Sequence, residues 1–428
     1  MSYVTRRIVT LLLLFLPLVL LPIQSAPAAP LSLTDCLLRA ATGNRSLRVS
    51  AFDEAIATQN VNLARSAFFP RIDFLGGYTA QLAEQRIQFN NNSLATQDAD
   101  YGFFSTTINH VFYDFGRREA RSRQASLLRE ATAHLHQGEE QELFLQVVTG
   151  YYGILHSGKL LMAMDDEVTR LTEHLRVAKR LHEQGVVTRN DLLQAEVRLA
   201  GSRQRRLSAA NEVEKEWLLL NFLTGQPDSF RAELDETMPE TNSPAELDDD
   251  TVTHRPEYQA GVKTVAAGEM NVSENRSAFY PELYLRGGVE YVENSTVKEQ
   301  ALYSASVGIR FNLFEGNATT ARLRQAVARR SQHEARLSDL YARLRLELAL
   351  AGRDLAVARE RIQVSEQAIR QAEENLRINR DRYLEKVGTA TELLDAQTLL
   401  THSRVDYYTA IYDCQIALAR VKKARGEL

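Results

Sequence analysis

The chain has 428 residues with 51 basic and 55 acidic side chains, which give a formal net charge of −4 at pH 7. This slightly acidic balance excludes the extended basic surface that a nucleic-acid partner requires. Two cysteines in a chain of this length cannot form a disulfide scaffold, so Cys36 and Cys414 are expected to be small packing residues on helices. An oxidised pair between them stays open as an alternative.

Residues 1–28 have the composition of a secretory signal peptide. Two arginines precede an apolar run over 11–21, and small residues follow up to Ala28. The alternative is a retained membrane anchor, but Pro17 and Pro22 interrupt a run that falls short of the ~20 apolar residues of a spanning helix. We therefore expect an exported chain. No later segment is apolar over such a length, so strands must make any crossing of a membrane.

The mature sequence contains a tandem duplication. The hexapeptide RSAFFP at 65–70 returns as RSAFYP at 276–281, and a glycine pair follows each copy. The same order continues, because YDFG at 113–116 has its counterpart in FEGN at 314–317. We therefore expect two repeats of one unit. The repeats and their link are assigned to 29–224, 253–428 and a connector over 225–252.

Proline placement separates expected helices from the rest of each repeat, because a proline inside a helix costs roughly 3 kcal/mol. Residues 71–226 and 282–428 contain no proline. Both repeats can therefore hold long helices, of which the one starting near 317 would be on the order of 100 Å long. The expected helices are 32–67, 117–184 and 190–223 in the first repeat, and 253–278, 317–386 and 391–424 in the second.

Small residues recur at every seventh position of the helices in the second repeat. Such spacing keeps one narrow seam turned toward a neighbouring helix. An ordinary two-stranded coiled coil would favour Leu and Ile in the seam, whereas small residues favour a wider ring of closely approaching helices. The seam of the long helix is Ala321, Ala328, Ala335, Ala342, Ala349 and Ala356, and that of the last helix is Ala396, Ser403, Ala410, Ala417 and Ala424.

Four segments are expected to be strands: 68–83, 100–116, 279–293 and 300–316. Over 301–313 apolar side chains alternate with polar ones at a period of two. A soluble sandwich would alternate too. However, each repeat offers only two strands joined by a polar loop, and even small closed barrels use about eight strands. Several protomers must therefore pool their strands, with apolar side chains toward lipid and polar ones inside.

In these features the chain resembles the TolC-like outer-membrane factor family over essentially its whole mature length. The resemblance rests on the duplicated strand entry at 65–70, the YDFGR exit at 113–117 and the GVVT turn at 185–188. It implies a mixed α and β fold: a homotrimeric twelve-stranded transmembrane β-barrel, four strands per protomer, continuous with a long periplasmic α-helical barrel. The connector would lie at the equator of that helical barrel.

The resemblance also implies a function. The chain would be a passive exit duct in the outer membrane, extending into the periplasm, for a tripartite efflux or type I secretion system. Its partners would be a periplasmic adaptor (membrane fusion protein), an inner-membrane pump and outer-membrane lipid, with no nucleic acid, cofactor or metal. Because the sequence has no Gly-Lys-[Ser/Thr] phosphate loop, energy must come from the pump.

Site residues follow from the resemblance at the periplasmic turns. Glu392 and Asp395 match an acidic pair that rings the aperture, and Asp191 and Tyr383 match residues that hold the closed state. Gly388 stands where the family has an arginine, which puts one closing link in doubt. Acids in the first turn of a helix also have a local explanation, because they stabilise its N-terminus.

An adaptor would dock on the two turns, although simple turn chemistry explains the same residues. The docking residues are Gly185, Val186, Val187 and Thr188 in the first turn, and Val387, Gly388 and Thr389 in the second.

Two other classes of protein fit less well. An enzyme is disfavoured because the nine histidines show no pair at metal-ligand spacing, the acidic run at 248–250 is typical of a solvated linker, and no nucleophile arrangement is found. A soluble periplasmic coiled-coil adaptor or scaffold would explain the signal peptide and the long helices. It would not explain strands with a polar inner face.

Overall fold

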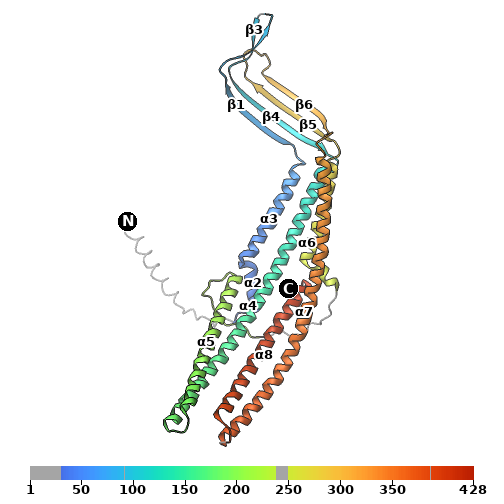
Figure 1. The fold of residues 1–428 in the computed structure, drawn as a ribbon. Coiled ribbons are helices and arrows are strands. Elements are labelled where there is room, and N and C mark those ends of the chain that lie inside the picture. Colours follow the sequence, from blue (N-terminus) through green and yellow to red (C-terminus); the bar gives the residue numbers. More distant parts are fainter. Residues whose placement is uncertain (1–29, 91, 238–248, 386) are drawn as a thin grey trace, which may run out of the picture.

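The computed structural model describes residues 30–90, 92–237, 249–385 and 387–428. The expected signal peptide at 1–28 and residues 238–248 of the connector lie outside the described residues. Figure 1 shows an elongated chain in which long helices run downward from a small curved sheet. No helix within the described residues combines the length and the apolar character that a membrane span requires.

The two halves of the chain contain the same elements in the same order. Both long helices have 67 residues and both lower helices have 36. The fold-class prediction, a mixed α and β chain with a tandem duplication, is therefore confirmed. The first half consists of α2 (Leu33–Gly43), α3 (Arg45–Ser66), β1 (Arg71–Ala80), β4 (Asp100–Tyr113), α4 (Arg117–Glu183) and α5 (Arg189–Thr224). The second consists of η1 (Asp249–His254), α6 (Pro256–Ser277), β5 (Glu282–Val292), β6 (Ala301–Arg310), α7 (Ala318–Leu384) and α8 (Ala390–Arg425).

The expected single helix over 32–67 was wrong, because the chain breaks at Asn44 into α2 and α3. The Asn44 side-chain oxygen accepts a hydrogen bond from the Leu47 amide at 3.0 Å and so caps α3. Its amide group donates to the Leu223 carbonyl at 2.9 Å, near the end of α5. The break therefore marks the place where α5 meets the upper helices.

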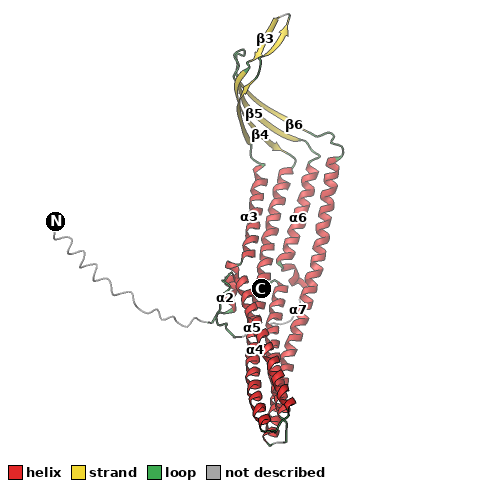
Figure 2. Ribbon diagram, turned by 60° about the vertical axis from the view of Figure 1, so that its left-hand side comes forward, coloured by secondary structure: helices red, strands yellow, loops and turns green. Residues whose placement is uncertain are grey.

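Two further expectations differ from the structure. The polar loop after β1 contains a hairpin of β2 (Gln85–Phe89) and β3 (Asn92–Gln97), which projects beyond the sheet in Figure 2. The expected helix over 253–278 starts only at Pro256, because proline fits the first helical position, where no N–H donor is needed. Each of the four sheet strands is also shorter than expected, since the flanking residues form turns.

The four strands form one antiparallel sheet in the order β1-β4-β5-β6. Its register separates two faces. One row across the sheet is Arg71, Asn109, Arg286 and Ser306, and the adjacent row on the other face is Ile72, Ile108, Gly287 and Ala305. The sheet thus has a polar face and an apolar face, and β1 and β6 are its edges.

Below the sheet the helices form a single layer. In the upper part α3, α4, α6 and α7 lie side by side, and in the lower part the order is α5, α4, α8 and α7 (Figures 1 and 2). One buried cluster surrounds Tyr151, Tyr152 and Trp217, and a second lies between α7 and α8 around Leu348 and Leu355. The two long helices therefore run through both the upper and the lower part of the layer, and the shorter helices pack along them.

The small-residue seams have different partners. All five seam residues of α8 are buried within the chain, whereas all six seam alanines of α7 are exposed. Large apolar side chains lie on the same side of α7 as these alanines and are also exposed: Leu346, Leu350, Val357 and Val364. The α8 seam thus packs inside the protomer, while the α7 seam is left without cover in a single chain.

Where α8 ends against α6, an ion network around the buried Arg255 side chain joins α4, α6, α7 and α8. The Arg255 side chain is 1% exposed and donates to Glu257 at 2.8 Å and to Glu347 at 2.7 Å. Lys423 lies 3.2 Å from Glu347 and 2.8 Å from Glu142 on α4. Each cation is shared between two carboxylates, so the network fixes the height at which the lower helices meet the upper ones.

Candidate functional site

The turn between α4 and α5 is closed by local hydrogen bonds. Helix α4 ends with Gly185 at φ +71°, in the left-handed region that glycine adopts without strain. Thr188 caps α5, and the Asp191 carboxylate accepts from the Thr188 amide at 2.9 Å and from its hydroxyl at 2.8 Å. These bonds lower the pKa of Asp191 below its ordinary value. In this conformation Asp191 acts as the partner in a capping box.

The second turn repeats this device with a different set of charges. The Thr389 hydroxyl accepts from the Glu392 amide at 3.2 Å, and the Glu392 carboxylate accepts from the Thr389 amide at 3.0 Å. An Arg382 nitrogen lies 3.8 Å from the same carboxylate. A Cβ atom added at Gly388 would come within 3.1 Å of the Arg382 Cβ, so the missing side chain lets the turn fold against Arg382.

Asp395 has a partner on the other lower helix. An Arg198 nitrogen on α5 lies 3.5 Å from its carboxylate, with the two side chains 42% and 66% exposed. Sequence reasoning identified both acids but missed Arg198 and Arg382. Arg198 lies 197 positions before its partner, so no local pattern pairs them; Arg382 directly precedes Tyr383 and could have been noticed.

The two turns also expose valines at their tips, whereas Val187 is partly buried and its carbonyl lies 3.2 Å from His182 Nδ1. Val186 is 66% exposed and Val387 is 70% exposed, so both side chains are accessible at the tips of the turns. Tyr383 is partly exposed at the end of α7, and its hydroxyl forms no hydrogen bond with another described residue. Asp191 and Tyr383 are therefore not bonded to each other within one chain, and any closing role would need another copy or another conformation.

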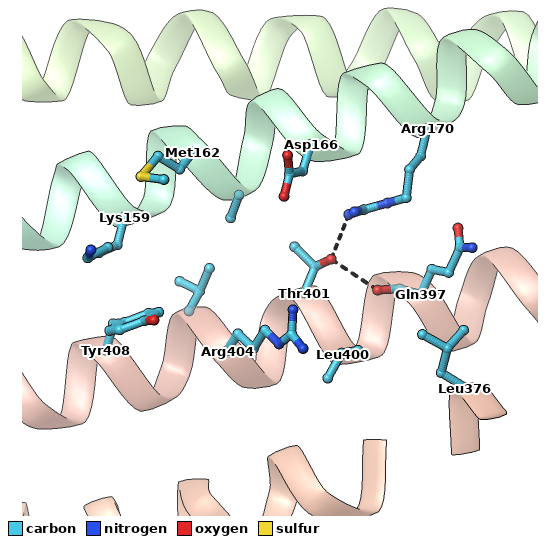
Figure 3. Close-up of a pocket in the computed structure, with 12 residues that line it drawn as sticks. Lys159, Met162, Asp166, Arg170, Leu376, Gln397, Leu400, Thr401, Arg404 and Tyr408 are labelled. Carbon is cyan, nitrogen blue, oxygen red and sulfur yellow. Dashed lines mark hydrogen bonds between the residues drawn. The ribbon is translucent and has the colours of Figure 1, made fainter. Parts of the chain in front are cut away.

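A groove of about 590 Å³ separates the two helix pairs above the turns (Figure 3). The Arg170 guanidinium on α4 crosses it and donates to the Thr401 hydroxyl on α8 at 2.7 Å. Nearer the equator, His156 on α4 lies 3.0 Å from the Thr409 hydroxyl. Along the groove the pair α4/α5 is thus joined to the pair α7/α8 by polar links, whereas nearer the equator Tyr152 of α4 packs against Tyr412 of α8 in the buried cluster.

No group of three or more His, Cys, Asp or Glu side chains arranged to hold a metal ion is found in the described part of the chain. Both cysteines are free and buried, Cys36 in the cluster around Tyr151 and Cys414 in the cluster between α7 and α8. Burial raises the pKa of the Cys36 thiol to about 11. The thiols are therefore packing groups, as the sequence indicated.

A repeated strand–helix unit with two 67-residue helices is an unusual combination, and comparison with known proteins identifies it. The family model described as outer membrane efflux protein matches residues 37–226 and 249–427. This chain belongs to the outer membrane efflux protein family. The resemblance to TolC-like outer-membrane factors is thereby confirmed, and so is the expected localisation in the outer membrane with an extension into the periplasm.

Members of the outer membrane efflux protein family are similar to this chain in sequence and in fold. The outer membrane efflux protein BepC of Brucella suis is 22% identical over 69% of this chain, and the outer membrane protein TolC of Vibrio cholerae is 23% identical over 65%. These alignments span 63% and 64% of the two relatives, which is less than two thirds of their length. The Campylobacter jejuni CmeC outer membrane channel has the same fold, with a TM-score of 0.84 and 14% identity over 92% of this chain and 85% of that chain.

Proposed function

We propose that three copies of this chain form one channel in the outer membrane and conduct solutes passively from a pump–adaptor complex. The main support for this proposal is that both edge strands of the sheet are unpaired within one chain. β1 and β6 are the open edges of a sheet with an even number of antiparallel strands. The β6 edge of one copy can therefore pair antiparallel with the β1 edge of the next, and a ring of copies closes without a free edge.

The two faces of the sheet fit lipid on one side and water on the other. On the apolar face Phe74 is 73% exposed and Tyr303 is 81% exposed in the single chain, and both lie in the same row. Water-exposed apolar surface of this kind is unfavourable in a soluble protein. This observation favours the channel over the alternative, a soluble periplasmic adaptor or scaffold.

The helical layer has matching apolar stripes at its two sides. On α3 the exposed side chains Val49, Phe52 and Ile56 follow helical spacing, and Leu63 continues the stripe. On α7, at the opposite side, the alanine seam and its flanking leucines and valines are exposed. In a closed ring the upper part of the α7 seam would cover the α3 stripe of the next copy, and the lower part would face α5 of that copy. The number three comes from the family resemblance, and four strands per copy then give twelve.

The periplasmic turns would form the closed end of this channel. Opening would separate α4/α5 from α7/α8 and break the links at Arg170 and Arg198. Glu392 and Asp395 would line the aperture, with Asp191 and Tyr383 beside them. The exposed Val186 and Val387 would meet the adaptor, within the turns that run from Gly185 to Thr188 and from Val387 to Thr389. The chain itself would catalyse nothing, because the pump supplies the energy.

Reconstitution of the purified protein tests the proposal. The expected result is a trimer that dissociates on heating and passes ions across a planar bilayer. Replacing the seam residue Ala349 by Glu should prevent trimer formation, because a charge would be buried in the helix contact. Glu366→Lys, at an exposed position of the same helix on the side away from Val364, is the matched control and should leave the trimer intact. A wild-type sample that stays monomeric in lipid and passes no ions would refute the proposal.

A further inference from the structure

A cavity of about 730 Å³ lies where the sheet meets the helices. It is bounded by the end of α3, the start of α4 and the lower ends of β1, β4 and β5. Four arginines are prominent among its lining residues: Arg71, Arg117, Arg118 and Arg121. We call it the junction cavity. Its acidic lining residues are Asp114, Glu274 and Glu282.

The strand residues of the junction cavity belong to the polar face of the sheet. Arg71 pairs with Asn109 across β1 and β4, and Asn109 pairs with Arg286 on β5. The neighbouring row on the opposite face contains Ile72 and Ile108, which are apolar. If the chain forms the channel proposed above, the junction cavity opens to the water-filled inside, just below the membrane.

Most acids near the junction cavity already have a cation. Arg118 binds Asp114 at 2.9 Å with both side chains largely buried, and Arg310 binds Glu282 at 2.7 Å. By contrast, Arg117 and Arg121 are exposed and form no ion pair with another described residue. The acid of the lining that lacks an ion pair to a described residue is Glu274 on α6. The guanidinium groups of Arg117 and Arg121 thus remain available to bind a ligand, and Glu274 is the single carboxylate of the lining that could oppose an anion there.

The tandem repeat provides an internal comparison. In the second half Ala318 and Thr319 stand where the first half has Arg117 and Arg118, and Arg322, the counterpart of Arg121, binds Glu315 at 2.7 Å. The fold therefore does not need unpaired arginines at this place. Helix stability does not need Arg117 either, because a cation in the first turn of a helix opposes its dipole.

We propose that the junction cavity binds anionic groups, phosphate or carboxylate, of solutes that move along the channel. Guanidinium groups match both anions by paired N–H···O hydrogen bonds. Arg117 and Arg121 are the primary ligands; Arg71, whose Nε donates to Asp73 at 2.8 Å and whose side chain is 81% exposed, can add its remaining guanidinium nitrogens. This site rests on the proposed channel function. It would give the channel a preference for anionic solutes near the membrane, above the acidic aperture at Glu392 and Asp395.

Inorganic pyrophosphate is a suitable probe. Its binding to the purified trimer in neutral detergent at low salt can be measured by titration calorimetry. Replacing both Arg117 and Arg121 by Gln is expected to weaken binding at least about tenfold, while the double Lys variant keeps the charge and loses less. Arg324→Gln, which removes an exposed arginine of α7 outside the cavity, is the matched control and should not change binding.

The outcomes separate this site from the proposed channel function and from a lipid site. Channel-forming trimers that bind no pyrophosphate, or bind it equally well after the double Gln substitution, would overturn the junction site and leave the channel intact. The titration repeated in phosphatidylcholine nanodiscs should give the same affinity when phosphatidylglycerol is added. Loss of pyrophosphate binding on that addition would identify a lipid headgroup as the occupant and refute a solute site.

Discussion

The hydrogen bond between Arg170 and Thr401 gives the sharpest test of how the periplasmic end of the proposed channel would be held closed. Replacing Thr401 by Val keeps the shape of the side chain and removes the hydroxyl that accepts from Arg170 at 2.7 Å. The bond joins α4 to α8 across the groove, whereas the packing within each helix pair is untouched (Figure 3). The substitution therefore changes one link between the pairs.

The size of the effect follows from the chemistry of the bond. A hydrogen bond to a charged group contributes about 1.5 to 3 kcal/mol, and the lower end applies here because water can enter the groove. About 1.5 kcal/mol corresponds to roughly a tenfold shift toward the open state in each protomer. The exposed ion pair of Asp395 with Arg198 is worth at most about 1 kcal/mol, or less than about sixfold.

Single-channel recording in planar bilayers measures this shift as the fraction of time in the high-conductance state. Thr401→Val should raise that fraction more than Asp395→Ala. Thr398→Val is the matched control, because the Thr398 hydroxyl donates only to Leu394 within α8 and should have no effect. If Thr401→Val behaves like the wild type, or if Asp395→Ala has the larger effect, Arg170 does not hold the pairs together.

Other variants test the aperture, the equatorial network and the thiols. Replacing both Glu392 and Asp395 by Ala should raise conductance or loosen cation selectivity, since carboxylates near a narrow pore favour cations; unchanged currents would argue against a gate there. Arg255→Ala should lower the free energy of unfolding by about 1.5 to 3 kcal/mol in urea, because it removes the charged hydrogen bonds to Glu257 and Glu347, whose carboxylates stay partly exposed; a loss below ~0.5 kcal/mol would contradict this. Burial raises the pKa of Glu347, but its bonds to Arg255 and Lys423 outweigh burial and hold the pKa below the ordinary 4.5. Its stabilisation is therefore complete above pH 4.5 and is lost as the pH falls through the lower folded value, so wild type should lose stability relative to Glu347→Gln in that range. Cys36 should resist maleimide until the protein unfolds, and labelling of the native protein would show that the helices open there.

Sequence patterns predicted the elements but only part of the site. The proline-free stretches predicted the long helices and the period-two alternation predicted most of the sheet strands, because both patterns act between residues close in the chain. The hairpin of β2 and β3 was missed, since its polar strands have no buried face to impose alternation. The acids Glu392 and Asp395 were identified, but their arginines were not, because Arg198 reaches Asp395 only through packing of α5 beside α8.

The sequence by itself determined the repeat, the helix lengths and the two-sided strands of this protein. The tertiary structure decided which surfaces are satisfied within one chain. The alanine seams of α7 and α8 have the same spacing, yet one is exposed and the other buried. Likewise Asn44 ends a helix because its amide finds the Leu223 carbonyl, 179 positions away. Periodicity specifies which side of a helix needs a partner, whereas the identity of that partner depends on how distant segments pack.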